Sequence, residues 1–175
     1  MKTLEKFELT PFGPYRFIGK SVYARAGGFC VTTQQSGIFG GLWKNSGWIF
    51  ETLDGLSEHA TDEIHDIALL TWEKFEDKSQ LLGYTVGRFM KPGTPVPAGM
   101  DYFDIEATFV GKGWVKSDPD AGLDFHLDIE QLTKDAINQQ NYYETGWKWF
   151  AEVYPQKSAV HGGPLMGLYM SCAKK

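Results

Sequence analysis

Cysteine is scarce in this sequence, and no metal-binding or redox motif accompanies it. The two cysteines, Cys30 and Cys172, lie far apart and form no C-x-x-C unit, the arrangement that zinc ribbons and dithiol enzymes use. The four histidines form no H-x-x-x-H or E-x-x-H pair, so no two ligands would share one face of a helix. We expect two free thiols, no metal site and no other cofactor.

Long apolar runs and an excess of basic charge are also missing. No stretch approaches the roughly 18 apolar residues that a membrane-spanning helix needs, and the first residues mix charged and apolar side chains too closely for a secretory signal. The 17 basic and 22 acidic residues give a net charge of -5, so no broad positive field attracts a phosphate backbone. The sequence predicts a cytoplasmic protein that binds neither membrane nor nucleic acid directly.

Aromatic side chains, in contrast, are abundant. The 175 residues include 12 Phe, 8 Tyr and 6 Trp. A chain of this length suffices for one domain with a sizeable core, and large rings can either fill that core or line a concave ligand site. Composition alone does not separate these two uses.

The first half of the chain reads as one strand, one helix and a hairpin. Residues 16–25 alternate as a strand, and apolar residues recur at nearly helical spacing over 36–53, which predicts a helix. Two apolar segments, 66–75 and 81–91, are joined by a polar turn that favours a hairpin. Three prolines within residues 91–99 then exclude further regular structure.

The second half repeats this order. Residues 102–110 alternate cleanly between apolar and polar side chains, as a half-buried strand does. A capping box at Asp128 predicts the start of a helix, and Gly146 is a suitable end. The segments 147–154 and 165–173 follow as two strands.

The repeated β-α-β-β order predicts the architecture. We expect a single α+β domain over residues 1–175, built from two halves at about 14–91 and 100–175. Two equal halves can share one antiparallel sheet about a pseudo-twofold axis. The helices would then lie on one side of the sheet and a ligand groove on the other.

Three segments resemble motifs of the GyrI-like small-molecule-binding family, which also supplies effector-binding domains of AraC-type regulators. They are LLGYTVGRFM (81–90), PVPAGMDYFDIEATFVGKGWV (95–115) and WFAEVYP (149–155). The resemblance implies a stand-alone bacterial effector-binding domain with Glu152 as the central acid of the ligand groove. It also implies a small organic ligand and, as in some members, DNA gyrase or a regulator as partner.

The residues around Glu152 support the same position independently. In the alternating segment, Phe150, Glu152 and Tyr154 share one face. A carboxylate between two rings suits a cationic aromatic ligand, because charge attraction adds to cation–π contacts. A plain solvated carboxylate is the alternative.

Three further residues are candidates for the groove. Glu106 and Tyr102 share the polar face of their predicted strand, and Glu106 would add a second acid if the two strands are neighbours. Tyr23 has comparable chances of facing the groove or solvent. Trp43 and Trp48 are assigned instead to the core side of the first helix, because a glycine-rich helix needs large buried residues.

The sequence therefore predicts a protein that binds a small cationic or amphipathic aromatic molecule around Glu152, for sensing or sequestration of drugs or toxins. The alternative is a hydrolase of strained electrophilic toxins with Glu152 as general base, an activity that the resemblance implies for some GyrI-like proteins. No catalytic residue beyond this base is assigned. Haem binding, as in the similarly built SOUL proteins, lacks a well-placed axial histidine.

Overall fold

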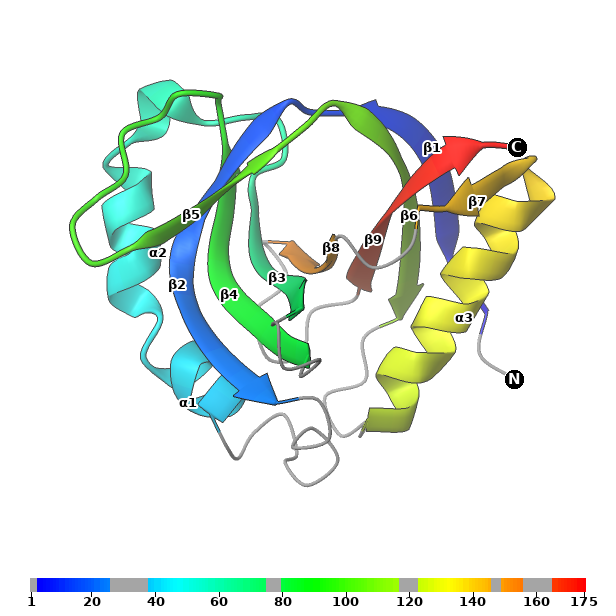
Figure 1. Ribbon diagram of the computed structural model, residues 1–175, viewed down its shortest axis with the longest axis horizontal. Coiled ribbons are helices and arrows are strands. Elements are labelled where there is room, and N and C mark those ends of the chain that lie inside the picture. The colour runs from blue at the N-terminus through cyan, green and yellow to red at the C-terminus, as the bar shows by residue number, and fades with distance from the viewer. Residues whose placement is uncertain (1–2, 26–37, 75–79, 117–122, 146–148, 156–164) are drawn as a thin grey trace.

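The computed structural model in Figure 1 describes most of the chain. The described segments are residues 3–25, 38–74, 80–116, 123–145, 149–155 and 165–175. Cys30 and Gly146 lie outside them.

Helices and strands follow the order that the sequence predicts, with additional strands. The first half contains β1 (Lys6–Phe12), β2 (Tyr15–Arg25), α1 (Ile38–Lys44), α2 (Gly47–Asp54), the 3-10 helix η2 (Ser57–His59), β3 (His65–Lys74) and β4 (Gln80–Met90). The second contains β5 (Asp101–Ile105), β6 (Thr108–Lys116), α3 (Leu123–Gln139), β7 (Tyr142–Glu144), β8 (Trp149–Pro155) and β9 (Leu165–Lys174). All strands join one antiparallel sheet, which confirms the predicted α+β class.

The strand order repeats on either side of the central β3–β8 pair. The sheet runs β1-β6-β9-β8-β3-β4-β2-β5, and β7 pairs with β9 beside this path. Outward from the centre, β3, β4 and β2 of one half therefore match β8, β9 and β6 of the other, as a pseudo-twofold axis predicts. The edges are exchanged, because β1 pairs with β6 and β5 pairs with β2.

The predicted helix over residues 36–53 is two short helices, α1 and α2, separated at Asn45 and Ser46. Asn45 Nδ2 donates to the Gly41 carbonyl (2.8 Å), and Ser46 Oγ donates to the Trp43 carbonyl (2.7 Å). Short polar side chains that bond the nearby backbone compete with the helical ladder. The apolar spacing is continuous here, whereas the helix is not.

The predicted start of the second helix is wrong. The helix α3 begins at Leu123, so Asp128 lies inside it and is not the residue at its start. It ends at Gln139, and Asn141 follows with a φ of 64°. This left-handed conformation does not continue a right-handed helix.

The predicted strand over residues 102–110 is also divided. At Glu106 and Ala107 the chain leaves β5, which pairs with β2, and enters β6, which lies between β1 and β9. Because the alternation of side chains runs on through the break, the sequence reads as one strand.

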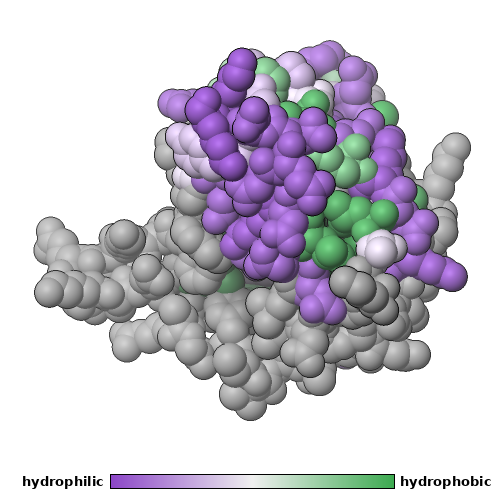
Figure 2. Space-filling model, turned by 90° about the vertical axis from the view of Figure 1, so that its right-hand side faces the viewer, coloured by the Kyte–Doolittle hydropathy of each residue, from purple (hydrophilic) through white to green (hydrophobic). Residues whose placement is uncertain are grey.

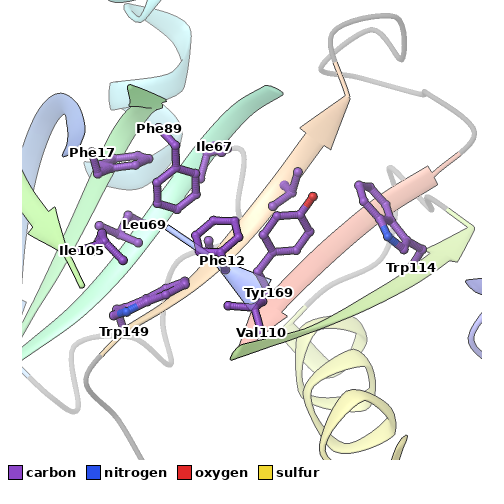
Figure 3. Packing of buried hydrophobic residues seen from close by; sticks show 12 residues of the cluster. Phe12, Phe17, Ile67, Leu69, Phe89, Ile105, Val110, Trp114, Trp149 and Tyr169 are labelled. Carbon is purple, nitrogen blue, oxygen red and sulfur yellow. The ribbon is translucent and has the colours of Figure 1, made fainter. Parts of the chain in front are cut away.

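The two faces of the sheet are covered differently. Figure 1 shows the sheet curved like an arch, with α1 and α2 outside one half and α3 outside the other. The inner face carries a tightly packed core (Figure 3), whose members are Phe12, Phe17, Ile67, Leu69, Phe89, Ile105, Val110, Trp114, Trp149, Ala151, Val153 and Tyr169. On the outer face, Ile49 and Leu53 of α2 and Ile129 and Ile137 of α3 enter two further clusters.

The helix α3 is amphipathic. Ile129, Thr133 and Ile137 recur at a spacing of four and are buried against the sheet, whereas Asp128 and Asp135 are exposed. This period places one apolar stripe on one side of a helix. Seen from this side of the molecule, the described surface is mainly hydrophilic, with a smaller hydrophobic area (Figure 2).

Candidate ligand-binding site

Glu152 lies in the middle of β8, on the face of the sheet that carries the helices. Along this strand Ala151 and Val153 belong to the inner core, while Phe150 and Tyr154 pack in the helix-side clusters. Since side chains alternate along a strand, Glu152 shares the face of Phe150 and Tyr154. It is only 7% exposed, so the carboxylate is a buried group rather than a solvated one.

Glu152 does not lie on the face of the sheet where the sequence analysis expected the groove. The sequence analysis places the groove on the face away from the helices, but that face of β8 is closed by the inner core, where Trp149, Phe12 and Phe89 pack against one another. The carboxylate therefore lies on the opposite face, among side chains of α1 and the neighbouring strands.

Two tyrosine hydroxyls hold the carboxylate. Tyr84 OH of β4 donates to Glu152 Oε2 at 3.1 Å, and Tyr154 OH donates to the same oxygen at 3.2 Å. Burial, together with the negative charge of Glu152, raises the pKa of both tyrosines well above the ordinary value. Both hydroxyls therefore stay protonated and remain donors at neutral pH.

Aromatic side chains of α1 complete the surroundings. Phe39 stacks on Tyr84 with ring centroids 4.4 Å apart, and Trp43 meets Tyr154 edge-on at 5.2 Å. Trp43 Nε1 also donates to Tyr84 OH at 2.9 Å, so one hydrogen-bonded chain leads from α1 to the carboxylate. We call Glu152, Phe39, Trp43, Tyr84 and Tyr154 the Glu152 cage.

The Glu152 cage combines a buried negative charge with several π-faces. At reduced dielectric a carboxylate attracts a cation more strongly than it does in water. Each ring that faces a cation adds about 0.5–2 kcal/mol. This arrangement is therefore chemically suited to a positively charged aromatic molecule.

Neither a protein-family model nor a curated protein matches the sequence, but solved structures match the fold. SAV2435 bound to tetraphenylphosphonium is similar over 96% of this chain and 94% of its own, with a TM-score of 0.62 at 12% identity. The chain has a GyrI-like fold. A Staphylococcus aureus MU50 protein proposed as a bacterial transcription regulator is similar over 97% of this chain and 99% of its own, with a TM-score of 0.63 at 13% identity. An integron cassette protein from the mobile metagenome of Vibrio cholerae covers 98% of both chains, with a TM-score of 0.54 at 10% identity.

Three residues that were predicted to line the groove are not brought to Glu152. Glu106 is exposed in the bend between β5 and β6, and β9 separates β6 from β8. Tyr102 is 51% exposed on the edge strand β5, where the Arg16 guanidinium lies 4.6 Å from its ring centroid. Tyr23 is 47% exposed on β2, which β4 and β3 separate from β8.

Conversely, Phe39, Trp43 and Tyr84 belong to the Glu152 cage although the sequence analysis did not select them. Trp43 was assigned to the helix core, and it does pack there, but its indole nitrogen also reaches Tyr84. A signal for Tyr84 exists in the sequence, because a tyrosine at a core-facing strand position needs a hydrogen-bond partner for its hydroxyl. That partner is the carboxylate two strands away.

The described residues were also compared with the expectations for metal ligands, thiols and membrane spans. No group of three or more His, Cys, Asp or Glu side chains within it could hold a metal ion. Cys172 is a free, buried thiol, and burial raises its pKa to about 11. No described helix is long and apolar enough to cross a membrane.

Proposed function

We propose that this GyrI-like domain binds a small cationic aromatic molecule, with Glu152 as its counter-ion, and so senses or sequesters drugs or toxins. The observation that carries the proposal is the buried carboxylate of Glu152, held by two tyrosine hydroxyls and surrounded by rings. Tetraphenylphosphonium, the ligand of the structurally similar SAV2435, is a molecule of this kind.

Burying a carboxylate is costly, so its presence in the core calls for a reason. The cost is several kcal/mol per ion even after relaxation. Hydrogen bonds to a charged group return about 1.5–3 kcal/mol each, and Tyr84 and Tyr154 provide two of them. Recognition of a cation would explain why an apolar side chain does not occupy this position.

A ligand of several rings needs α1 to move, because Glu152 is only 7% exposed. The helix α1 has seven residues, and helices this short have little stability of their own. It is held over the carboxylate by the Trp43 hydrogen bond and by the Phe39 and Trp43 ring contacts. The rings of an incoming ligand would replace these contacts.

Calorimetric titration of wild type and Glu152→Gln with tetraphenylphosphonium, and with the neutral triphenylphosphine oxide, tests the proposal. Glutamine keeps the shape and removes the charge, so we expect the cation to lose on the order of 2–5 kcal/mol of binding free energy. The neutral compound should bind both proteins equally. Glu106→Gln, which removes an exposed acid outside the cage, is the matched control. Equal affinity of wild type and Glu152→Gln for the cation would refute the proposal.

Hydrolysis of a strained electrophile is the second candidate. It is favoured by the direct contact of Glu152 with Tyr84 and Tyr154, which sets a base beside two hydroxyl donors. Turnover that disappears in Glu152→Gln and also in Tyr84→Phe would select this candidate over binding alone. A gyrase or regulator partner and a cytoplasmic location stay predictions.

A further inference from the structure

The indole of Trp43 fills a slot beside Glu152 whose walls belong to other elements. Its plane stacks on the ring of Phe50 of α2, with centroids 6.1 Å apart and an angle of 29°, and it meets the ring of Tyr154 of β8 at 78°. Its Nε1 donates to Tyr84 OH of β4 at 2.9 Å. None of these three walls is part of α1, so a movement of α1 would withdraw the indole and leave them in place.

The ring of Phe50 is fixed by contacts that do not involve Trp43. The Arg88 guanidinium of β4 lies 5.0 Å from its ring centroid, and Arg88 Nη2 donates to Asp66 Oδ1 of β3 at 3.0 Å. Arg88 also pairs with Asp54 at the end of α2. The helix α2 is therefore tied to the sheet by its own contacts, and this wall of the slot does not depend on α1.

The hydroxyl group of Tyr84 determines which kind of atom can face it from the slot. A phenolic hydroxyl has one hydrogen, and that hydrogen is directed to Glu152 Oε2 at 3.1 Å. Toward Trp43, Tyr84 OH therefore acts as an acceptor. Because Tyr84 is only 6% exposed, withdrawal of the indole leaves a buried acceptor without its donor, which corresponds to a factor of about ten in an equilibrium constant. A ligand recovers this factor only if it brings a donor of its own.

Shape, charge and hydrogen bonding in the slot together define a class of ligand. We infer that the ligands of the Glu152 cage are planar bicyclic heteroaromatic cations with a ring N–H group, and that the indole of Trp43 occupies their place until one binds. The inference rests on the proposed function, which supplies the positive charge. The ligand's N–H group donates to Tyr84 OH, and its ring lies against Phe50 and Tyr154. Tetraphenylphosphonium has the charge but neither the flat shape nor the donor.

Trp43→Ala vacates the slot and gives the first test. Calorimetric titration with protonated 2-aminobenzimidazole, a planar bicycle with ring N–H groups, should show binding at least about tenfold tighter than to wild type, because the ligand no longer has to displace the indole. Trp48→Ala removes an indole that is 45% exposed on α2. It is the matched control and should bind the cation as wild type does. Equal affinities of Trp43→Ala and wild type would overturn the inference.

A second cation tests the N–H group in the wild-type chain, which needs no substitution to fold. 1,3-Dimethylbenzimidazolium has the same bicycle and a permanent positive charge but no N–H group. We expect wild type to bind protonated 2-aminobenzimidazole about tenfold more tightly than this cation. The preference should disappear in Tyr84→Phe, which removes the acceptor. A preference that persists in Tyr84→Phe, or that is absent from wild type, would contradict the inference.

Glu152→Gln separates a failure of this inference from a failure of the proposed function. If tetraphenylphosphonium binding depends on Glu152 while the two bicyclic cations bind wild type equally, only the inferred ligand class is wrong. If tetraphenylphosphonium and both bicyclic cations bind Glu152→Gln as tightly as wild type, the proposed function is wrong, and the inferred ligand class with it.

Discussion

The helical layers of the two halves are attached to the sheet in different ways. In the second half, α3 lies so close to β6 that a Cβ atom added at Gly113 would come within 2.2 Å of Thr133 Oγ1. In the first half, α1 reaches the sheet through the rings of Phe39 and Trp43. The pseudo-symmetric halves thus combine one closely docked helix of 17 residues with a short helix of seven, held by side chains.

Under the proposed function, this difference places the opening of the domain at α1. Closely packed interfaces tolerate little added volume, so α3 is a fixed part of the structure. Contacts such as the rings of Phe39 and Trp43 and the Trp43 hydrogen bond can be exchanged for similar contacts with a ligand. In the proposed binding, α1 is the helix that gives way over Glu152, and α3 serves as support.

The largest effect is expected when the close docking of α3 is disturbed. Gly113→Ala forces Thr133 to shift, and such overpacking costs about 1–3 kcal/mol of stability. Urea denaturation measures the loss. Thr133→Ala in the same chain should restore part of the stability, because it removes the atom that the new methyl group meets. Unchanged stability of Gly113→Ala would mean that α3 is no more tightly docked than α1.

A smaller effect is expected at Trp43. Trp43→Phe keeps a ring but removes the donor to Tyr84 OH. This loss should lower the free energy of unfolding, and so the stability, by about 0.5–1.5 kcal/mol. Because α1 must leave the carboxylate before a large cation binds, the same variant should bind tetraphenylphosphonium severalfold more tightly. Calorimetry and denaturation on one preparation measure both changes. Weaker binding would mean that Trp43 holds the ligand rather than covering its site.

The smallest effect, with the opposite sign, is expected at Gly41. A Cβ atom added there meets nothing within 4 Å, so Gly41→Ala should stabilise α1 by about 0.5–1 kcal/mol. Tetraphenylphosphonium should then bind up to about fivefold more weakly. Gly47→Ala in α2, where a Cβ atom also meets nothing within 4 Å, is the control and should leave binding unchanged. Equal affinities for Gly41→Ala and wild type would argue that α1 does not move.

The sequence predicted the parts of the structure that depend on local spacing. Alternation in the segment 149–155 placed Phe150, Glu152 and Tyr154 on one face, and the structure has them there. The repeated order of strands and helices likewise predicted one antiparallel sheet of two halves. These features follow from the periods of strands and helices, which a single sequence carries.

What the sequence did not predict depends on which strands become neighbours. Glu106 was grouped with Glu152 on the assumption of adjacent strands, yet β9 lies between β6 and β8. The partnership of Trp43 with Tyr84 joins residues 41 positions apart. Periodicity assigns a side chain to a face but does not say which distant residue it meets on that face.

The exchanged edge strands affect the order in which the newly made chain can fold. The strand β1 finds its partner only in β6, about a hundred residues later, and Phe12 at its end is buried among rings of β8 and β9. At the opposite edge of the sheet, β2 of the first half pairs with β5, which also follows β4 in the chain. During synthesis on the ribosome, the first half therefore cannot be completed until much of the second has emerged. The two repeats are translated one after the other but must be completed together.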